Sequence, residues 1–405
     1  MEISKDKLRK HVSYLASGEL KGREFGSEGD MQAAQYIQKH FKEYGLIAPK
    51  QCPDYLQKFP FGGRNVIGIL NGNDPELSNQ CIVIDAHHDH MGDGFVGASD
   101  NAAGVAILLE LARVLAKSKE KIKRSLLFTC FDGEEQILNV NGKKQLMQGA
   151  TYYVQNPVFD LKSIAAMLTL DTLGRNALSN DLIFILGTER SLFLQSIIYD
   201  CPTNLRKIMF SIDMLTGIKG NYLPFVDKKI PSLFISNGIH QDYHGKGDTP
   251  EKLSDELLFN DATFLIELIS KIDNSENKPD FCKNQICPEG EAEDILHLLT
   301  LLKEAIRKNT PEGADKFDYI ISKLAGKPSQ KDMKQAVQIV LGFSTPNFAK
   351  LYLLLNDAQN AEKKKDYKNA LTHYNKILEL YNEYRVPYFW LQEIKDKVQN
   401  LQKKI

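Results

Sequence analysis

The sequence lacks a long apolar run, an excess of charge of either sign, and a dense set of cysteines. No stretch approaches the ~18 consecutive apolar residues of a membrane-spanning helix, so we expect no membrane span. The net charge of −1 gives no electrostatic basis for binding nucleic acid or an anionic membrane. With 42% hydrophobic and 25% charged residues, the 405-residue chain has the composition of a globular protein with two or three domains.

Six cysteines are too few for a disulfide scaffold. Cys81 and Cys130 lie within apolar runs, and we expect them to be small buried groups. Cys282 and Cys287 share a loop, where they could be free thiols, a disulfide or half of a metal site. No second cysteine pair follows that would complete such a site.

The amino-terminal residues 1–15 are basic but contain no apolar core, so they are not a secretory signal. This absence favours the cytoplasm. The periplasm or secretion is the alternative if a signal sequence has been removed.

Two motifs that mark hydrolases are also missing. The helical zinc motif H-E-x-x-H and the nucleophile elbow G-x-S-x-G do not occur. Residues Gly92 to Gly97 match the dinucleotide pattern G-x-G-x-x-G, but they neither follow a strand directly nor open a helix. We therefore interpret that match as a chance occurrence.

Apolar strand-like runs alternate with helical patterns from the amino terminus to Ile272. This alternation predicts a largely parallel sheet covered by helices, an α/β fold. Residues 273–290 begin with a polar linker, and from about Glu291 helical patterns dominate to the end. We therefore predict a catalytic domain at 1–272, a linker at 273–290 and a helical domain at 291–405.

The helical domain contains one segment that resembles the second helix of a tetratricopeptide hairpin. Tyr367, Ala370, Tyr374 and Leu378 carry this pattern. Such repeats need several stacked copies, and only one is convincing. We expect residues 291–405 to pack against the catalytic domain or a second subunit, rather than to bind peptide motifs.

Residues of the metal-ligand type follow four separate strand-like runs. His87 and Asp89 follow the first run, Glu134 and Glu135 the second, Asp171 the third, and His244 the fourth after a turn. In open α/β sheets, ligands bind beyond the carboxyl ends of the strands. Together with Asp100, these segments predict one metal centre built from two histidines and three carboxylates.

Each of these residues also has an ordinary alternative role. Asp100 could cap a helix, although the small residues around it would also let a metal approach closely. Arg175 could neutralise Asp171 in a salt bridge, and His244 could be a loop histidine. His88 and His90 are weaker ligand candidates than His87.

Glu134 and Glu135 are adjacent carboxylates that repel one another unless a cation or a proton compensates. Neighbouring side chains cannot easily face the same metal. We therefore expect one of the pair to be a ligand and the other a general base. Asp89 is placed to orient His87 through a hydrogen bond.

Five motifs in this order, AHHDHMG, GASDNAAG, FDGEEQ, LTLDTLGR and DYHGKGDT, resemble those of the M28 family of zinc aminopeptidases. The resemblance covers about residues 5–270 and excludes the C-terminal helices. It implies a three-layer α/β/α sandwich with a mixed, mostly parallel sheet, to which the all-helical appendage is added. The longer connection after Glu135 is expected to form an extra loop near the cleft.

The resemblance also implies a two-zinc site and a role for each residue. His87 and Asp171 would hold one zinc, Glu135 and His244 the other, and Asp100 would bridge them. Asp89 would lie behind His87, and Glu134 would be the general base. The substrates would be peptides with a free N-terminus.

Three other functions compete with this one. A glutaminyl cyclase would use a single zinc, but Asn221 and Tyr243 differ from the Asp and Trp typical of the cyclases. A zinc carboxypeptidase or deacylase of a related family would have similar H-x-D and E-E motifs. A receptor-like module would be expected to lose ligands, and this chain keeps all five together with Glu134.

Overall fold

The computed structural model describes residues 2–136, 138–140, 143–145, 148–215, 220–309, 317–344, 346–381, 384 and 388–404. Its centre is an eight-stranded mixed sheet with the order β1-β2-β4-β3-β7-β10-β8-β9. The strands are β1 (Leu56–Lys58), β2 (Arg64–Leu70), β3 (Cys81–Asp85), β4 (Ser125–Cys130), β7 (Ile164–Leu170), β8 (Leu182–Leu186), β9 (Arg206–Ile208) and β10 (Ser232–Ser236). The four central strands β4, β3, β7 and β10 are parallel.

Side chains on the central strands alternate between two apolar layers, as the period of two in a β-strand requires. On β3, Ile82 and Ile84 belong to one buried cluster, whereas Cys81 and Val83 belong to another on the opposite face. The strand is therefore apolar throughout because both of its faces are covered.

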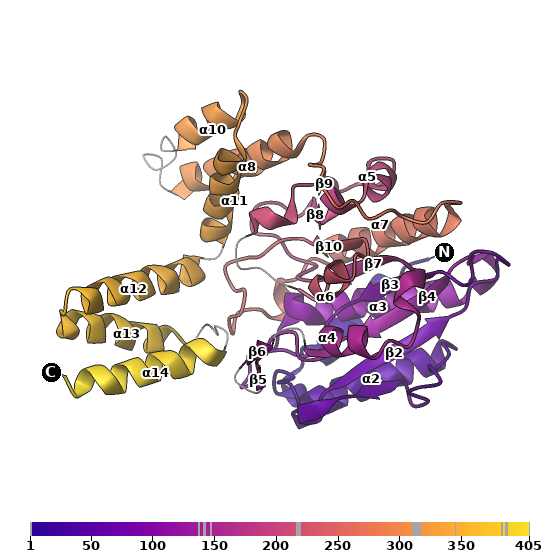
Figure 1. Cartoon of the computed structure of the whole chain (residues 1–405), viewed down its shortest axis with the longest axis horizontal. Helices are drawn as coiled ribbons and strands as arrows, with labels where there is room; N and C mark the ends of the chain where they lie inside the picture. The colour runs from indigo at the N-terminus through magenta and orange to yellow at the C-terminus, as the bar shows by residue number, and fades with distance from the viewer. Residues whose placement is uncertain are drawn as a thin grey trace.

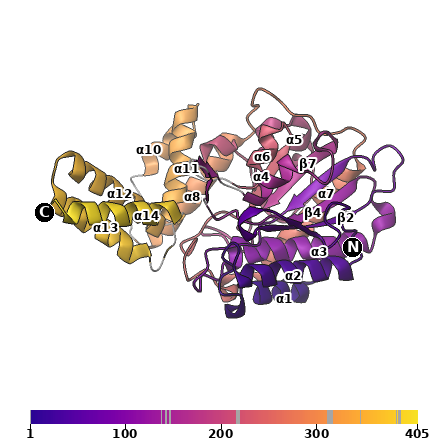
Figure 2. The ribbon, with the colours of Figure 1, turned by 60° about the horizontal axis from the view of Figure 1, so that its bottom comes forward.

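Helices cover both faces of the sheet, which confirms the predicted α/β/α sandwich (Figure 1 and Figure 2). One face packs against α1 (Lys5–Leu15), α2 (Glu28–Glu43), α3 (Gly104–Ala116) and α7 (Asp255–Asn274). The other face packs against α4 (Gln148–Gln155) and α6 (Leu223–Asp227). Helix α5 (Leu192–Tyr199) contacts α7.

The connection after Glu135 forms a small hairpin of β5 (Leu138–Val140) and β6 (Lys143–Gln145). The extra loop predicted from the sequence therefore contains its own antiparallel strand pair. No helix among the described residues is long and apolar enough to cross a bilayer.

The C-terminal helices pack in two separate groups. The first group is α8 (Glu291–Asn309), α10 (Asp318–Leu324) and α11 (Gln330–Ser344). Leu299 of α8 and Val337 of α11 share a buried cluster with Leu182 of β8 and Ile208 of β9. This group therefore extends the apolar core past β9, the edge strand of the sheet. We call the sheet and the helices that cover it the catalytic unit.

The second group is α12 (Pro346–Lys363), α13 (Tyr367–Tyr381) and α14 (Tyr388–Gln402). It has a buried cluster of its own that includes Ala358, Ala370, Tyr374 and Leu401. We call α12, α13 and α14 the terminal three-helix unit. In Figure 1 it stands to one side of the sheet, with the end of α13 and the beginning of α14 turned toward the catalytic unit.

Candidate metal centre

The sheet brings the predicted ligands to one edge. His87 follows β3, Glu134 and Glu135 follow β4, Asp171 follows β7, and His244 lies in the loop after β10. These four strands are adjacent and parallel, so their carboxyl ends lie side by side. Residues separated by more than 150 positions therefore meet because of the strand order alone.

Asp100 reaches the same place from a turn between β3 and α3. Its backbone (φ −120°, ψ 83°) is not helical, and α3 begins at Gly104 without a side-chain cap. Asp100 therefore does not cap this helix. Asp248 fixes the turn because its carboxylate accepts the backbone N–H groups of Ser99 (3.0 Å) and Asp100 (3.2 Å).

A glycine permits this turn. A Cβ at Gly97, where φ is +56°, would lie 2.2 Å from the backbone oxygen of Asp100 and 2.5 Å from the ring of His90. A side chain there would push the turn away from the sheet. The small residues around Asp100 thus serve the close approach expected from the sequence.

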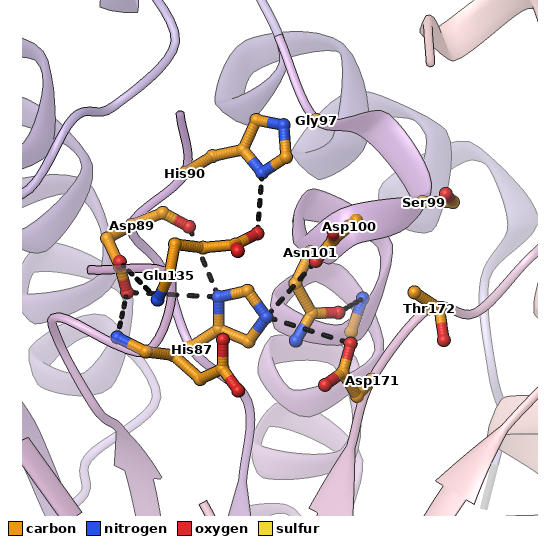
Figure 3. A network of polar contacts seen from close by, with 12 residues as sticks. His87, Asp89, His90, Gly97, Ser99, Asp100, Asn101, Glu135, Asp171 and Thr172 are labelled. Atoms are coloured by element: carbon orange, nitrogen blue, oxygen red, sulfur yellow. Dashed lines mark hydrogen bonds and ion pairs between the residues drawn. The ribbon is translucent and has the colours of Figure 1, made fainter. Parts of the chain in front are cut away.

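The two oxygens of Asp100 face two different histidines (Figure 3 shows the His87 side). Its Oδ1 lies 3.2 Å from His87 Nε2, and its Oδ2 lies 3.2 Å from His244 Nε2. Asp171 Oδ1 lies 3.7 Å from His87 Nε2, and Glu135 Oε2 lies 3.3 Å from His244 Nε2. The five residues thus form two groups that share Asp100.

These separations fit divalent metal ions. Ligands bound tetrahedrally at about 2.0–2.2 Å from zinc lie about 3.3–3.5 Å from one another. Within the described part of the chain, His87 Nε2 and Asp100 Oδ2 are buried and make no hydrogen bond. Buried polar atoms are rarely left in this way, so an ion between the side chains would complete both groups.

The histidines and carboxylates of the site shift one another's pKa. Burial alone lowers the pKa of His87, but the nearby carboxylates Asp100 and Asp171 raise it well above its usual value. Burial raises the pKa of Asp100, but contacts with His244 and His87 bring it well below its usual range. The carboxylates around the two histidines thus favour a positive charge at this place, which a bound cation would supply.

Glu134 differs from Glu135 in its surroundings. It is half-buried, and burial together with the charges of Glu135 and Asp171 raises its pKa well above the usual value. His87, Glu134 and Glu135 each offer a ligand atom within 4.8 Å of one another. The carboxylate of Glu134 is therefore close to the centre, which is where a general base is required.

Asp89 contacts both His87 and the loop that carries Glu134 and Glu135. Its two carboxylate oxygens accept the backbone N–H groups of Glu134 (3.1 Å) and Glu135 (3.2 Å). The ring nitrogen Nδ1 of His87 lies 3.2 Å from the backbone oxygen of Asp89 and 3.8 Å from its carboxylate. The backbone therefore makes the closer contact to His87.

Sequence reasoning gave little weight to His90 and missed two supporting residues. His90 Nδ1 lies 3.0 Å from Glu135 Oε1, so it can orient that ligand (Figure 3). Asp248 fixes Asp100, and the buried side chain of Arg23 donates hydrogen bonds to the backbone oxygens of His88, Val96 and Gly97. Arg23 in LKGREFG and Asp248 in GKGDT are charged residues among glycines, and this was the available sign of a supporting role.

The structure decides between the alternatives for Arg175, Cys282 and Cys287. Arg175 pairs with Asp242 at 2.7 Å, which leaves Asp171 facing His87. Cys282 and Cys287 are free thiols rather than a disulfide.

A model of Peptidase family M28 matches residues 65–268, half of the chain. The chain belongs to this family. The match confirms the family predicted from the motifs, and with it a metal-binding hydrolase of the peptidase class.

Two curated relatives match shorter segments. A glutaminyl-peptide cyclotransferase of Bos taurus is 32% identical over 124 residues, 27% of this chain and 34% of the relative. A probable zinc metalloprotease of Pyrenophora teres f. teres (strain 0-1) is 33% identical over 127 residues, 29% of this chain and 24% of the relative. The chain thus spans about a third or less of the length of these relatives.

The fold resembles that of the LapA aminopeptidase of Legionella pneumophila, with a TM-score of 0.53 and 14% identity. The similarity covers 68% of this chain and 73% of the other. At this identity the likeness concerns the fold alone.

Proposed function

We propose that this chain is a co-catalytic two-zinc aminopeptidase, which hydrolyses the N-terminal peptide bond of peptides. His87 and Asp171 would hold one zinc, and Glu135 and His244 the other, with Asp100 shared between them. The observation that carries the proposal is that each Asp100 oxygen faces a different histidine at 3.2 Å. A carboxylate shared in this way is the arrangement of a two-metal site.

The chain's own residues supply the proton transfers. When bound, a pair of zinc ions lowers the pKa of water and polarises the scissile carbonyl. Glu134 takes the proton of that water and returns it to the nitrogen of the leaving amine.

Burial of the centre restricts what can react there. His87, Asp100 and Asp171 are nearly inaccessible to solvent, so a chain end would reach them more readily than an internal segment of a peptide. A free α-amine of the substrate would contact the metal and the acidic groups around it, among them Glu134. These two features together support cleavage from the N-terminus.

The test is mass spectrometry of a peptide mixture with free and acetylated N-termini, incubated with zinc-loaded protein. We expect stepwise loss of residues from free N-termini only, abolished by a chelator and by Glu134→Gln. The absence of N-terminal trimming would contradict the proposal. Trimming from the C-terminus would instead indicate a carboxypeptidase.

A glutaminyl cyclase is the second candidate, favoured by the 32% identity to the bovine cyclotransferase segment. In this chain Tyr243 stacks on His244 with the ring centres 3.9 Å apart. The cyclases typically have a Trp at this position. A product formed from N-terminal Gln by loss of ammonia, without hydrolysis, would support the cyclase.

A further inference from the structure

Tyr384, between α13 and α14, touches the loop that carries His244. The backbones of Gly245 and Tyr384 form an isolated antiparallel β-bridge. A Cβ at Gly245 would lie 2.7 Å from Cε1 and 2.9 Å from Cδ1 of the Tyr384 ring. The ring of Tyr384 is therefore packed directly on the residue that follows a metal-ligand candidate.

The contacted loop has a fixed conformation. The backbone N–H of Gly245 donates to the backbone oxygen of Asp242 at 2.8 Å. The Asp242 carboxylate pairs with Arg175 at 2.7 Å and with Lys252 at 2.8 Å. Tyr384 thus meets an anchored turn, so its position relative to His244 is defined.

Tyr384 is also fixed from its own side. Its backbone N–H donates to the backbone oxygen of Leu380 in α13 at 3.0 Å. Tyr381, one turn earlier, is buried in the apolar cluster of the terminal three-helix unit. The backbone of Tyr384 is consequently tied to a helix of this unit.

We propose that Tyr384 forms the outer wall of the substrate cleft beside His244 and makes the enzyme prefer short peptides. This inference rests on the proposed aminopeptidase function. Once the N-terminal residue is at the metal centre, the rest of the peptide must leave the cleft. On the His244 side we expect it to pass Tyr384, so the steric penalty grows with the number of residues that follow the cleaved bond.

The test compares three variants of the full-length, zinc-loaded protein. Tyr384→Ala removes the wall, Tyr384→Phe keeps the ring, and Tyr319→Ala removes a tyrosine that is 68% exposed on α10. Each is assayed on a series from dipeptide to decapeptide with the same first two residues. Zinc content and thermal unfolding are measured in parallel to show that each variant is folded and loaded.

In Tyr384→Ala we expect the ratio of kcat/KM for the decapeptide to that for the dipeptide to rise about tenfold. The gain should be mostly in KM, because the wall blocks binding rather than chemistry. Tyr384→Phe and Tyr319→Ala should keep the wild-type ratio. An unchanged ratio in Tyr384→Ala, with dipeptide turnover intact, overturns the role of Tyr384 alone. If the wild-type protein trims no peptide of any length, the proposed function fails as well.

Discussion

The neighbouring residues His87 and His88 enter two buried polar clusters that differ in how their charge is balanced. His87 faces Asp100 and Asp171, and no arginine or lysine of the described chain forms an ion pair with either carboxylate. His88 lies 3.2 Å from Asp30, which also pairs with Arg64 at 2.9 Å. The backbone N–H of Arg64 donates to Asp132 at 2.8 Å.

Both clusters contain metal-ligand residues close enough to hold an ion. In the His88 cluster, however, the guanidinium of Arg64 already pairs with Asp30, the carboxylate that faces His88. The His87 cluster combines four carboxylates with histidines only. The comparison teaches that the donor set alone does not define a metal site, because a built-in cation can satisfy the same side chains.

The largest expected effect separates the two clusters by catalysis. Glu134→Gln should lower kcat by about 10³-fold or more, since general-base catalysis is lost while the ligands remain. Asp132→Asn, on the same loop but in the His88 cluster, should change kcat only a few-fold. Near-normal turnover of Glu134→Gln, measured on a cleaved peptide at saturation, would show that Glu134 is not the base.

Metal content separates them next. Asp100→Asn should weaken zinc binding by more than about 100-fold, since it removes a charged ligand shared by both ions. Asp30→Asn should bind as much zinc as the wild type because Arg64 already balances that cluster. Elemental analysis after dialysis provides the readout. Two retained equivalents in Asp100→Asn would mean that Asp100 is not a ligand.

Stability should show the opposite pattern. Arg64→Met removes the guanidinium from Asp30, and we expect a loss of about 2 kcal/mol in the free energy of unfolding, because Arg64 is only partly exposed. The turnover of the folded enzyme should not change. The double variant Arg64→Met/Asp30→Asn should recover part of the loss in denaturant titrations. An unchanged free energy of unfolding in Arg64→Met would show that Arg64 does not balance the charge of Asp30.

A third histidine, His11, differs from both because its surroundings favour the neutral imidazole. Burial, followed by the charges of His40 and Lys7, lowers its pKa to about 3. The folded state therefore binds fewer protons than the unfolded state, in which the pKa is 6.5. The contribution of His11 is complete above pH 6.5 and is lost progressively as the pH falls from 6.5 toward 3.

At pH 5.5 the loss from His11 should be about 1 kcal/mol of unfolding free energy. His11→Asn should lack this part of the pH dependence. Denaturant titrations at pH 7.5 and 5.5 compare the two proteins. Equal pH dependence in both would show that His11 does not titrate as its surroundings require.

The metal centre was more accessible to sequence reasoning than its supports. Most of the proposed ligands follow an apolar strand, and parallel strands must bring their carboxyl ends together, so local patterns were sufficient to predict that these side chains meet. Asp248 and Arg23 act through backbone groups of distant segments, and no local pattern reveals such contacts. His90 was undervalued because the alternation of side chains no longer holds after β3 ends.

The C-terminal helices show the same limit. Helical periodicity predicted the helices after Glu291, but not that α8 and α11 would share an apolar cluster with β8 and β9. Nor does any pattern around Tyr384 indicate its contact with Gly245. Long-range packing depends on complementary surfaces, which one sequence does not display. The domain boundary at 273–290 stays a prediction.

The central claim is that Asp100 joins two metal ions in one catalytic centre. The most direct test is to add zinc in steps to metal-free protein and to measure release of the first residue from a peptide with a free N-terminus. We predict that turnover reaches its maximum only at two equivalents per chain. Full activity at one equivalent, with ammonia as the product from N-terminal Gln, would contradict the claim and indicate a single-zinc cyclase.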